Sequence, residues 1–281
     1  MTLGLPRLRQ TLQNPSERFQ GLALHSGRDA WLRLLPAEAG RGLLFVDAES
    51  GQEIPARTEN LGDTSRQTQI HAGGRTLSTV EHLLSALAAL RVDDVRIEVS
   101  GPELPIADGS AAPFITLIQA AGIAAHPSAT AVEPLVLREP LLLTGAAGSS
   151  AVALPAPHFQ ATVALSYPNH PYLGHQIATF DAMTDDYASQ IAPARTYGFL
   201  SEIEQLHARG LGLGASYDNA LVLGETEYVT PPRFENELAR HKLLDLIGDL
   251  ALTGRPLHMH IVAVKPGHQL NTGLALLLSK L

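Results

Sequence analysis

No cysteine occurs among the 281 residues of this chain. This absence excludes disulfides, thiolate metal sites and cysteine nucleophiles together. Any metal ion must therefore be bound by histidine, aspartate or glutamate side chains.

Long apolar runs are also missing. The first twenty residues contain no run of signal-peptide length, and no later stretch reaches the ~18 to 20 apolar residues of a membrane span. We therefore expect a cytoplasmic protein without stable membrane insertion. The formal charge of -8 comes without a dense Lys/Arg block. This argues against a nucleic-acid partner, because phosphate contacts need clustered cations.

Two common catalytic signatures are absent as well. The glycine-rich stretch Gly210 to Ser216 lacks the preceding strand and following helix of a dinucleotide fingerprint, and there is no GxxxxGK[ST] loop. There is no GxSxG nucleophile elbow either. Serine hydrolases and nucleotide-triphosphate enzymes have no positive support.

What the chain does contain predicts an α+β protein with two similar domains. Its length and 45% hydrophobic content permit a large core. The pattern predicts strands at 31–35, 42–46 and 95–99, helices at 78–90 and 115–124, and a Pro/Gly-rich loop between them. A Pro/Ala-rich stretch over 123–134 indicates a boundary. We therefore expect domains at residues 1–126 and 127–281.

The second domain repeats the order of helix, short turn and strand. Strands are expected at 135–143, 160–165 and 257–264, with a helix over 235–252. Sliding the second half on the first by 159 positions places His241 on His82. An internal duplication explains this match. Chance is the alternative, because any two amphipathic helices can be aligned in some register.

The helix over 235–252 carries acidic and histidine side chains at intervals of four. His241, Asp245 and Asp249 share one face, while leucines form another. A histidine and an aspartate at i and i+4 can direct a nitrogen and an oxygen at one zinc ion if a third ligand comes from elsewhere. Taken alone, this helix also fits an ordinary solvated face.

The helix over 78–90 offers further candidates in Glu81 and His82. One metal ion can bind His82 while Glu81 reaches water beside it. The alternative for Glu81 is structural, since Ser78 and Glu81 have the spacing of a capping box, and His82 also fits a partly buried histidine. His268 is expected at a strand end or turn, where catalytic groups are often displayed. Histidines 158, 170, 175 and 207 lack a matched acidic partner.

Taken together, six segments resemble the motifs of the UDP-3-O-acyl-N-acetylglucosamine deacetylase family and occur in the same order. They are STVEHLLSAL, LPIADGSAAPF, ARTYGF, GASYDNALVL, RHKLLDLIGDL and KPGHQLN. The early GLALHSG resembles the family's GxGLHSG. The resemblance spans roughly residues 13 to 278. It implies two sheet-and-helix domains with an active site in the crevice between them, and a step towards lipid A as the function.

The resemblance also implies the roles of individual residues. Zinc would be bound by His82, His241 and Asp245, with Glu81 as general base. Thr196 would stabilise the oxyanion, and His268, oriented by Asp249, would be cationic and assist at the oxyanion or the leaving amine. Two histidines and a carboxylate suit Fe²⁺ as well as Zn²⁺.

The substrate contacts follow from the same resemblance. Lys242 would meet the diphosphate of an acylated UDP-amino sugar, and an insertion after ARTYGF would form an acyl channel, although ordinary surface packing explains the same segment. The remaining candidates for substrate binding are Leu24, Tyr197, Phe199, Ile203, Gly212 and Tyr217.

Some residues depart from the family pattern, and other functions stay open. Pro266 replaces a small polar residue, and Tyr197 stands where Phe is common. The alternatives are an inactive nucleotide-sugar-binding protein and a zinc deacetylase of a related sugar amide. We expect a monomer.

Overall fold

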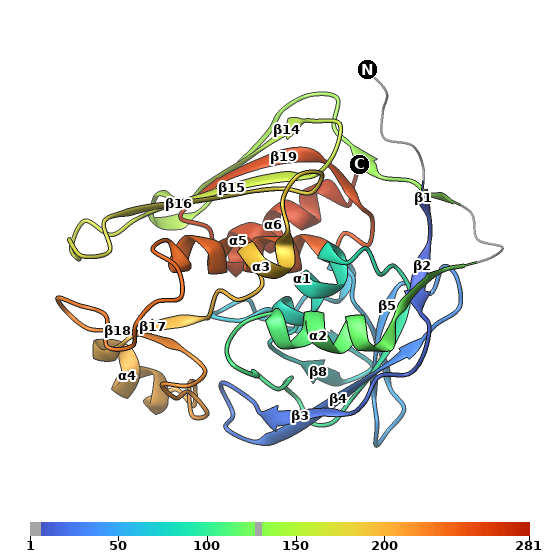
Figure 1. The fold of residues 1–281 in the computed structure, drawn as a ribbon, viewed down its shortest axis with the longest axis horizontal. Helices are drawn as coiled ribbons and strands as arrows, with labels where there is room; N and C mark the ends of the chain where they lie inside the picture. The colour runs from blue at the N-terminus through green and yellow to red at the C-terminus, as the bar shows by residue number, and fades with distance from the viewer. Residues whose placement is uncertain (1–6, 127–130) are drawn as a thin grey trace.

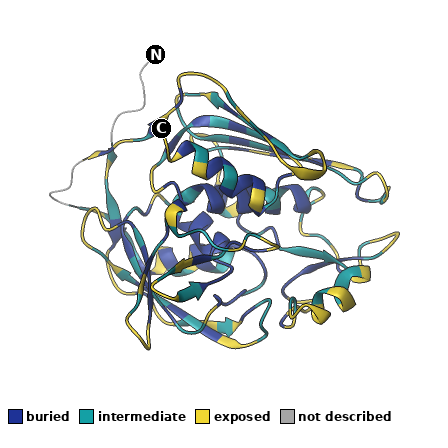
Figure 2. Cartoon of the chain, turned by 180° about the vertical axis from the view of Figure 1, so that it is seen from behind, coloured by how far each residue is buried: buried dark blue, intermediate teal, exposed yellow. Residues whose placement is uncertain are grey.

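The computed structural model describes residues 7–126 and 131–281. Two large sheets form its outer layers and four helices lie between them (Figure 1). The helices are α1 (Glu81–Ala89), α2 (Ala112–Ala121), α5 (Glu237–Ala251) and α6 (His268–Leu278). Buried residues concentrate where these helices meet the sheets, as Figure 2 shows in dark blue. No helix in the described ranges is long and apolar enough to cross a membrane.

The first sheet has five strands in the order β3-β4-β9-β5-β6. All neighbours are antiparallel except β5 and β9, which run parallel. Burial alternates along β4 and β9, so one face of the sheet covers the helices and the other faces outward. The strands are β3 (Phe19–Leu22), β4 (Asp29–Pro36), β5 (Leu43–Asp47), β6 (Glu53–Pro55) and β9 (Val95–Val99).

The second sheet repeats this topology. Its path is β13-β14-β19-β15-β16, with β15 and β19 parallel, the other neighbours antiparallel, and β12 added beside β19. In each half a helix directly precedes the central strand (α1 before β9, α5 before β19), and a second helix follows that strand (α2 and α6). The strands are β12 (Leu135–Val136), β13 (Leu141–Thr144), β14 (Ser150–Pro155), β15 (Gln160–Ser166), β16 (His175–Asp181) and β19 (Leu257–Val264).

The shared topology confirms the α+β class and two similar sheet-and-helix units, and it supports an internal duplication. The strand expected at 257–264 is present with those bounds, whereas the one expected at 135–143 is divided into β12 and β13. The helix expected at 115–124 begins and ends three residues earlier. The expected boundary between 126 and 127 adjoins residues 127–130, which lie outside the described residues.

Short elements complete the chain. A parallel pair, β17 (Tyr197–Phe199) and β18 (Leu221–Leu223), lies with α4 (Ile203–Ala208) beside the main layers (Figure 1). The other elements are β1 (Arg7–Leu8), β2 (Gln10–Leu12), η1 (Thr58–Asn60), β7 (Ile70–Ala72), β8 (Arg75–Leu77), β10 (Ile123–Ala125), β11 (Ala131–Val132), η2 (Ala146–Gly148), α3 (Tyr187–Gln190) and η3 (Leu200–Glu202).

Helices α1 and α5 pack in direct contact at the centre, and this contact positions the site. Gly248 of α5 faces the carbonyl oxygen of Glu81, and a Cβ atom at this glycine would overlap with that oxygen. Glycine therefore allows the two helix backbones to approach closely. Residues of the first turn of α1 are brought beside the polar side chains of α5.

Candidate active site

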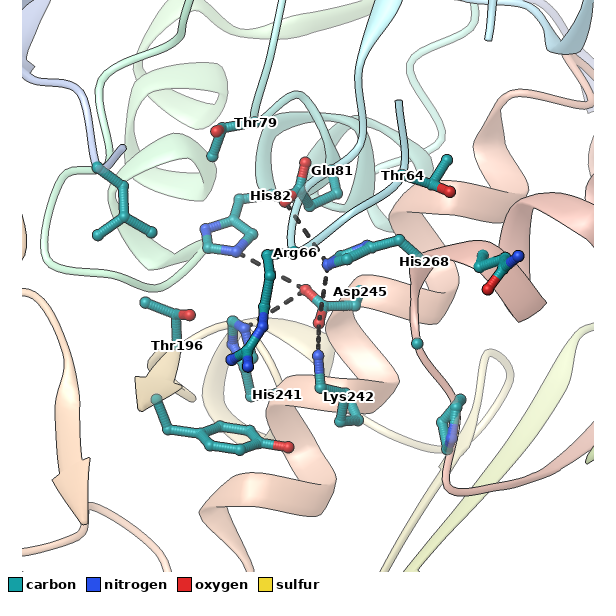
Figure 3. Close-up of a pocket in the computed structure, with 15 residues that line it drawn as sticks. Thr64, Arg66, Thr79, Glu81, His82, Thr196, His241, Lys242, Asp245 and His268 are labelled. Atoms are coloured by element: carbon teal, nitrogen blue, oxygen red, sulfur yellow. Dashed lines mark hydrogen bonds and ion pairs between the residues drawn. The ribbon is translucent and has the colours of Figure 1, made fainter. Parts of the chain in front are cut away.

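A buried group of three potential metal ligands forms where α1 meets α5. Its members are His82, His241 and Asp245, and their donor atoms lie within 4.8 Å of one another. Oδ1 of Asp245 is 3.4 Å from Nε2 of His241 and 3.7 Å from Nε2 of His82. Figure 3 shows the three side chains converging on one point. These separations exceed hydrogen-bond lengths and leave room for an ion between the atoms.

The chemistry of these donors fits a divalent cation. Nδ1 of His241 donates to the carbonyl of Ala194 at 3.1 Å, which leaves Nε2 unprotonated and directed at the group. Oδ1 of Asp245 is buried and has no hydrogen-bond partner among the described residues. Such an orphaned acceptor is costly unless a cation satisfies it. Two imidazoles and one carboxylate fit Zn²⁺ and Fe²⁺ equally.

The protonation states favour metal binding. Burial, together with the neighbouring His241, lowers the pKa of His82 to about 3. Burial also lowers the pKa of His241. Burial alone would raise the pKa of Asp245, but His241 and Lys242 hold it well below its usual range. Near neutral pH the group therefore presents two neutral imidazoles and one carboxylate.

Glu81 is the first residue of α1, and this position excludes one of its two expected roles. The residue before the helix is Val80, and no side chain caps this end. The capping box with Ser78 is therefore not formed. Oε2 of Glu81 instead accepts a hydrogen bond from the amide of Thr68 at 3.1 Å. Burial raises the pKa of Glu81 to about 7, as suits a group that accepts a proton near neutral pH.

His268 and Asp249 form a buried pair beside Glu81. His268 begins α6, directly after the expected turn, and its Nδ1 donates to Oδ2 of Asp249 at 3.0 Å. Its Nε2 lies 4.0 Å from Oε1 of Glu81 and 3.9 Å from Oδ2 of Asp245. Burial alone would lower the pKa of His268, but Asp249 and Asp245 raise it to about 9. This imidazole is therefore cationic near neutral pH.

A second buried glutamate fixes the segment that carries Thr196. Glu237, the first residue of α5, accepts hydrogen bonds from Nε of Arg195 at 2.9 Å and from the Arg195 amide at 3.0 Å. The Thr196 amide donates to the carbonyl of Gly109 at 2.7 Å. These bonds hold Thr196 at the pocket and the Ala194 carbonyl against His241.

One cavity of about 350 Å³ unites these groups. Its lining residues come from both halves of the chain. They are Leu24, Thr64, Arg66, Thr79, Glu81, His82, Thr196, Tyr197, His241, Lys242, Asp245, Pro266, Gly267, His268 and Gln269. Metal-ligand, basic and acidic candidates therefore face one space.

Comparison with known proteins identifies the family. The family model described as UDP-3-O-acyl N-acetylglycosamine deacetylase matches residues 9–280. The chain belongs to this family. It is 40% identical over 267 residues to the UDP-3-O-acyl-N-acetylglucosamine deacetylase of Syntrophotalea carbinolica, covering 93% of this chain and 85% of the relative. The protein of that name from Thermosynechococcus vestitus is 42% identical, covering 92% and 90%. The one from Myxococcus xanthus is 41% identical, covering 90% and 81%.

Lys242, the remaining polar candidate, lies in the pocket and forms an ion pair with Asp245. Its Nζ is 2.7 Å from Oδ2 of Asp245 and 5.6 Å from the centre of the Tyr197 ring. Burial would lower the pKa of Lys242, but Asp245 raises it, so the ammonium stays charged.

The other expected substrate-binding residues separate into two groups. Leu24 and Tyr197 line the pocket. Phe199 stacks on His170, with ring centres 4.6 Å apart, in the neighbouring β17–β18 unit. Ile203 begins α4, and Tyr217 is 59% exposed. Gly212 donates its amide to Nδ1 of His25, which docks its loop on the first half of the chain.

Arg66 is a functional candidate that no pattern in the sequence indicated. Arg66 lines the pocket from an irregular segment, has a positive φ of 68°, and pairs with Glu202 at 3.0 Å. Irregular segments have no periodicity that would mark such a residue. A separate expectation was wrong: His158 does have an acidic partner, since its Nε2 lies 2.8 Å from Oδ1 of Asp181.

Proposed function

We propose that this protein hydrolyses the acetamide of UDP-3-O-acyl-N-acetylglucosamine, releasing acetate and UDP-3-O-acyl-glucosamine, an early step towards lipid A. The observation that carries this proposal is the convergence of His82, His241, Asp245, Glu81 and His268 in one pocket of a chain from this family. We place Zn²⁺ in the group of three ligands, with Fe²⁺ as a substitute. Held there, the cation would supply Lewis-acid activation of water and of the amide carbonyl.

Two side chains of the protein, Glu81 and His268, carry out the proton transfers. Oε1 of Glu81, which the Thr68 bond leaves free, takes a proton from the attacking water. The protonated His268 and the Thr196 hydroxyl face the oxygen that gains charge when water adds to the carbonyl. As the carbon–nitrogen bond breaks, the Nε2 proton of His268 passes to the leaving nitrogen, which departs as the amine, and the proton held by Glu81 then restores the cationic His268. Asp249 holds the His268 ring in place through Nδ1.

The wider assignments belong to the same proposal. Lys242 contacts the diphosphate, and Leu24, Tyr197 and the β17–β18 unit guide the acyl chain. The protein acts in the cytoplasm as a monomer of two domains, residues 1–126 and 127–281. The charge of Lys242 and the apolar side chain of Leu24, which both line the pocket, support this division of the substrate.

Metal content and acetate release from UDP-3-O-acyl-N-acetylglucosamine test the proposal. We expect about one metal ion per chain and turnover for the wild type. Glu81→Ala should keep the metal and lose activity, and His241→Ala should lose both. His175→Ala, which changes an exposed histidine of β16, is the matched control and should keep both.

Each alternative predicts a different result. A wild type that binds metal and substrate but releases no acetate would be a nucleotide-sugar-binding protein. Faster release from a related N-acetyl sugar lacking the acyl chain would identify a deacetylase of another sugar amide. Metal-free, inactive wild type would overturn the metal assignment as well.

A further inference from the structure

Thr68 lies at the centre of the site, although it lines no part of the pocket wall. It is fully buried and precedes β7 in an irregular segment. Its carbonyl accepts from the amide of Val80, and its own amide donates to Oε2 of Glu81 at 3.1 Å. One oxygen of Glu81 is thereby fixed, and Oε1 is left to face His268.

The hydroxyl of Thr68 contacts the other proton-carrying group. Its Oγ1 donates to Oδ1 of Asp249 and lies 3.2 Å from Nδ1 of His268. Oδ2 of Asp249 accepts from Nδ1 of His268 at 3.0 Å and from Asn271 at 2.9 Å. Thr68 thus supplies the partner of the second carboxylate oxygen. Without this donor, Oδ1 would be buried with no other partner among the described residues, and only the bonds to Oδ2 would hold the carboxylate against the imidazole.

These partners come from three helices in two halves of the chain. Glu81 lies on α1, Asp249 on α5 and His268 on α6. A single residue that bonds to all three sets the separation between the groups that accept and donate protons. Displacements of about 1 Å at such groups cost on the order of 100-fold in rate.

We propose that Thr68 is a positioning residue, whose amide orients Glu81 and whose hydroxyl orients the Asp249–His268 pair for the same catalytic cycle. This inference rests on the proposed deacetylase function. The amide is present in every variant, so substitutions at Thr68 isolate the contribution of the hydroxyl.

Thr68→Val removes the hydroxyl while keeping the shape of the side chain. We expect kcat for acetate release to fall by roughly 10- to 100-fold, with KM and metal content unchanged, because Thr68 belongs neither to the pocket lining nor to the group of potential metal ligands. Thr68→Ser keeps the hydroxyl and should return kcat to within about threefold of wild type.

Thr253→Val is the matched control. This threonine is also buried, and its hydroxyl donates to the carbonyl of Leu250 at 2.8 Å, away from the pocket. It should lose a comparable amount of thermal stability and keep the wild-type kcat. If Thr68→Val, like Thr253→Val, loses thermal stability but keeps the wild-type kcat, the inference is overturned. It is also overturned if Thr68→Ser fails to restore kcat.

A spectroscopic measurement separates this inference from the deacetylase assignment. The Nδ1 proton of His268 should give a slowly exchanging imidazole resonance in the metal-free protein, assigned by its loss in His268→Ala. We expect the resonance to disappear in Thr68→Val and to persist in Thr68→Ser and Thr253→Val. An unchanged resonance in Thr68→Val overturns the inference, whereas an inactive wild type that shows the expected resonances overturns only the deacetylase assignment.

Discussion

Helices α1 and α5 occupy equivalent places in the two halves, and each begins with a buried glutamate. Burial raises the pKa of Glu81 in α1 to about 7. Burial would also raise the pKa of Glu237 in α5, but hydrogen bonds from Arg195 and a backbone donor at Arg233 lower it. A buried glutamate that begins a helix thus has a pKa near neutrality in one half and is a fixed anion in the other.

The difference shows that the repeated topology places a glutamate at the start of each helix, while the surrounding residues determine its pKa. Within residues 7–126 and 131–281, Glu81 has one backbone donor and no guanidinium partner, so its charge is costly and its proton is exchangeable. Glu237 pairs with Arg195 at 2.9 Å and holds the segment that orients His241 and Thr196. The predictions below test this contrast.

The largest expected effect is on catalysis, at Glu81. Glu81→Gln should lower kcat/KM for acetate release by about 10²- to 10⁴-fold, the usual contribution of a general base. Metal content and melting temperature should stay close to wild type, because the amide keeps the size of the side chain. Steady-state kinetics with metal analysis checks this outcome. Retained activity would show that Glu81 is not the base.

Substitution of Glu237 should lower the stability of the fold rather than act directly on catalysis. Glu237→Ala leaves Arg195 buried without its carboxylate, which typically costs about 3–5 kcal/mol in the free energy of unfolding. We expect the melting temperature to fall on the order of 10 °C in calorimetry.

The control for Glu237 is Glu53→Ala, which breaks an exposed pair with Arg41 and should cost about 1 kcal/mol or less. Equal effects of the two substitutions would contradict the structural role of Glu237.

The close contact between the two helices should tolerate no added methyl group. Gly248→Ala directs a Cβ atom at the Glu81 carbonyl and should cost about 1–3 kcal/mol of stability, despite the better helix propensity of alanine. Activity per folded molecule should also fall, because Glu81 and His82 shift relative to α5. Gly273→Ala in α6 is the control, because the nearest atom to its added methyl group is a leucine methyl at 3.4 Å. Chemical denaturation of both variants measures the difference in stability.

The smallest effect is on pH dependence. Because folding lowers the pKa of Glu237, its contribution to stability is present above the unfolded pKa of about 4.3 and is lost as pH falls through the folded value. The stability difference between wild type and Glu237→Gln should therefore shrink as the solution is acidified below about pH 4. Urea unfolding at several pH values measures it, and a difference independent of pH would contradict the ion-pair account.

Much of the site could be predicted from the sequence because it lies on periodic elements. The four-residue interval of His241, Asp245 and Asp249 needs only a helix to place them on one face. Folding then brings His241 and Asp245 together with His82. The order of motifs indicated the family, which the comparisons show. The roles of these residues remain predictions.

Other features had no local signal. The spacing of Ser78 and Glu81 fits a capping box as well as a base, and only the observed start of α1 at Glu81 removed the first role. The contacts of Thr68 and Arg66 join irregular segments to residues more than a hundred positions away. The sequence by itself determined which side chains share a helix face, because periodicity is local. Tertiary structure alone decided the partners of Glu81 and Glu237, because pKa and role depend on burial and on charges that chain folding brings near.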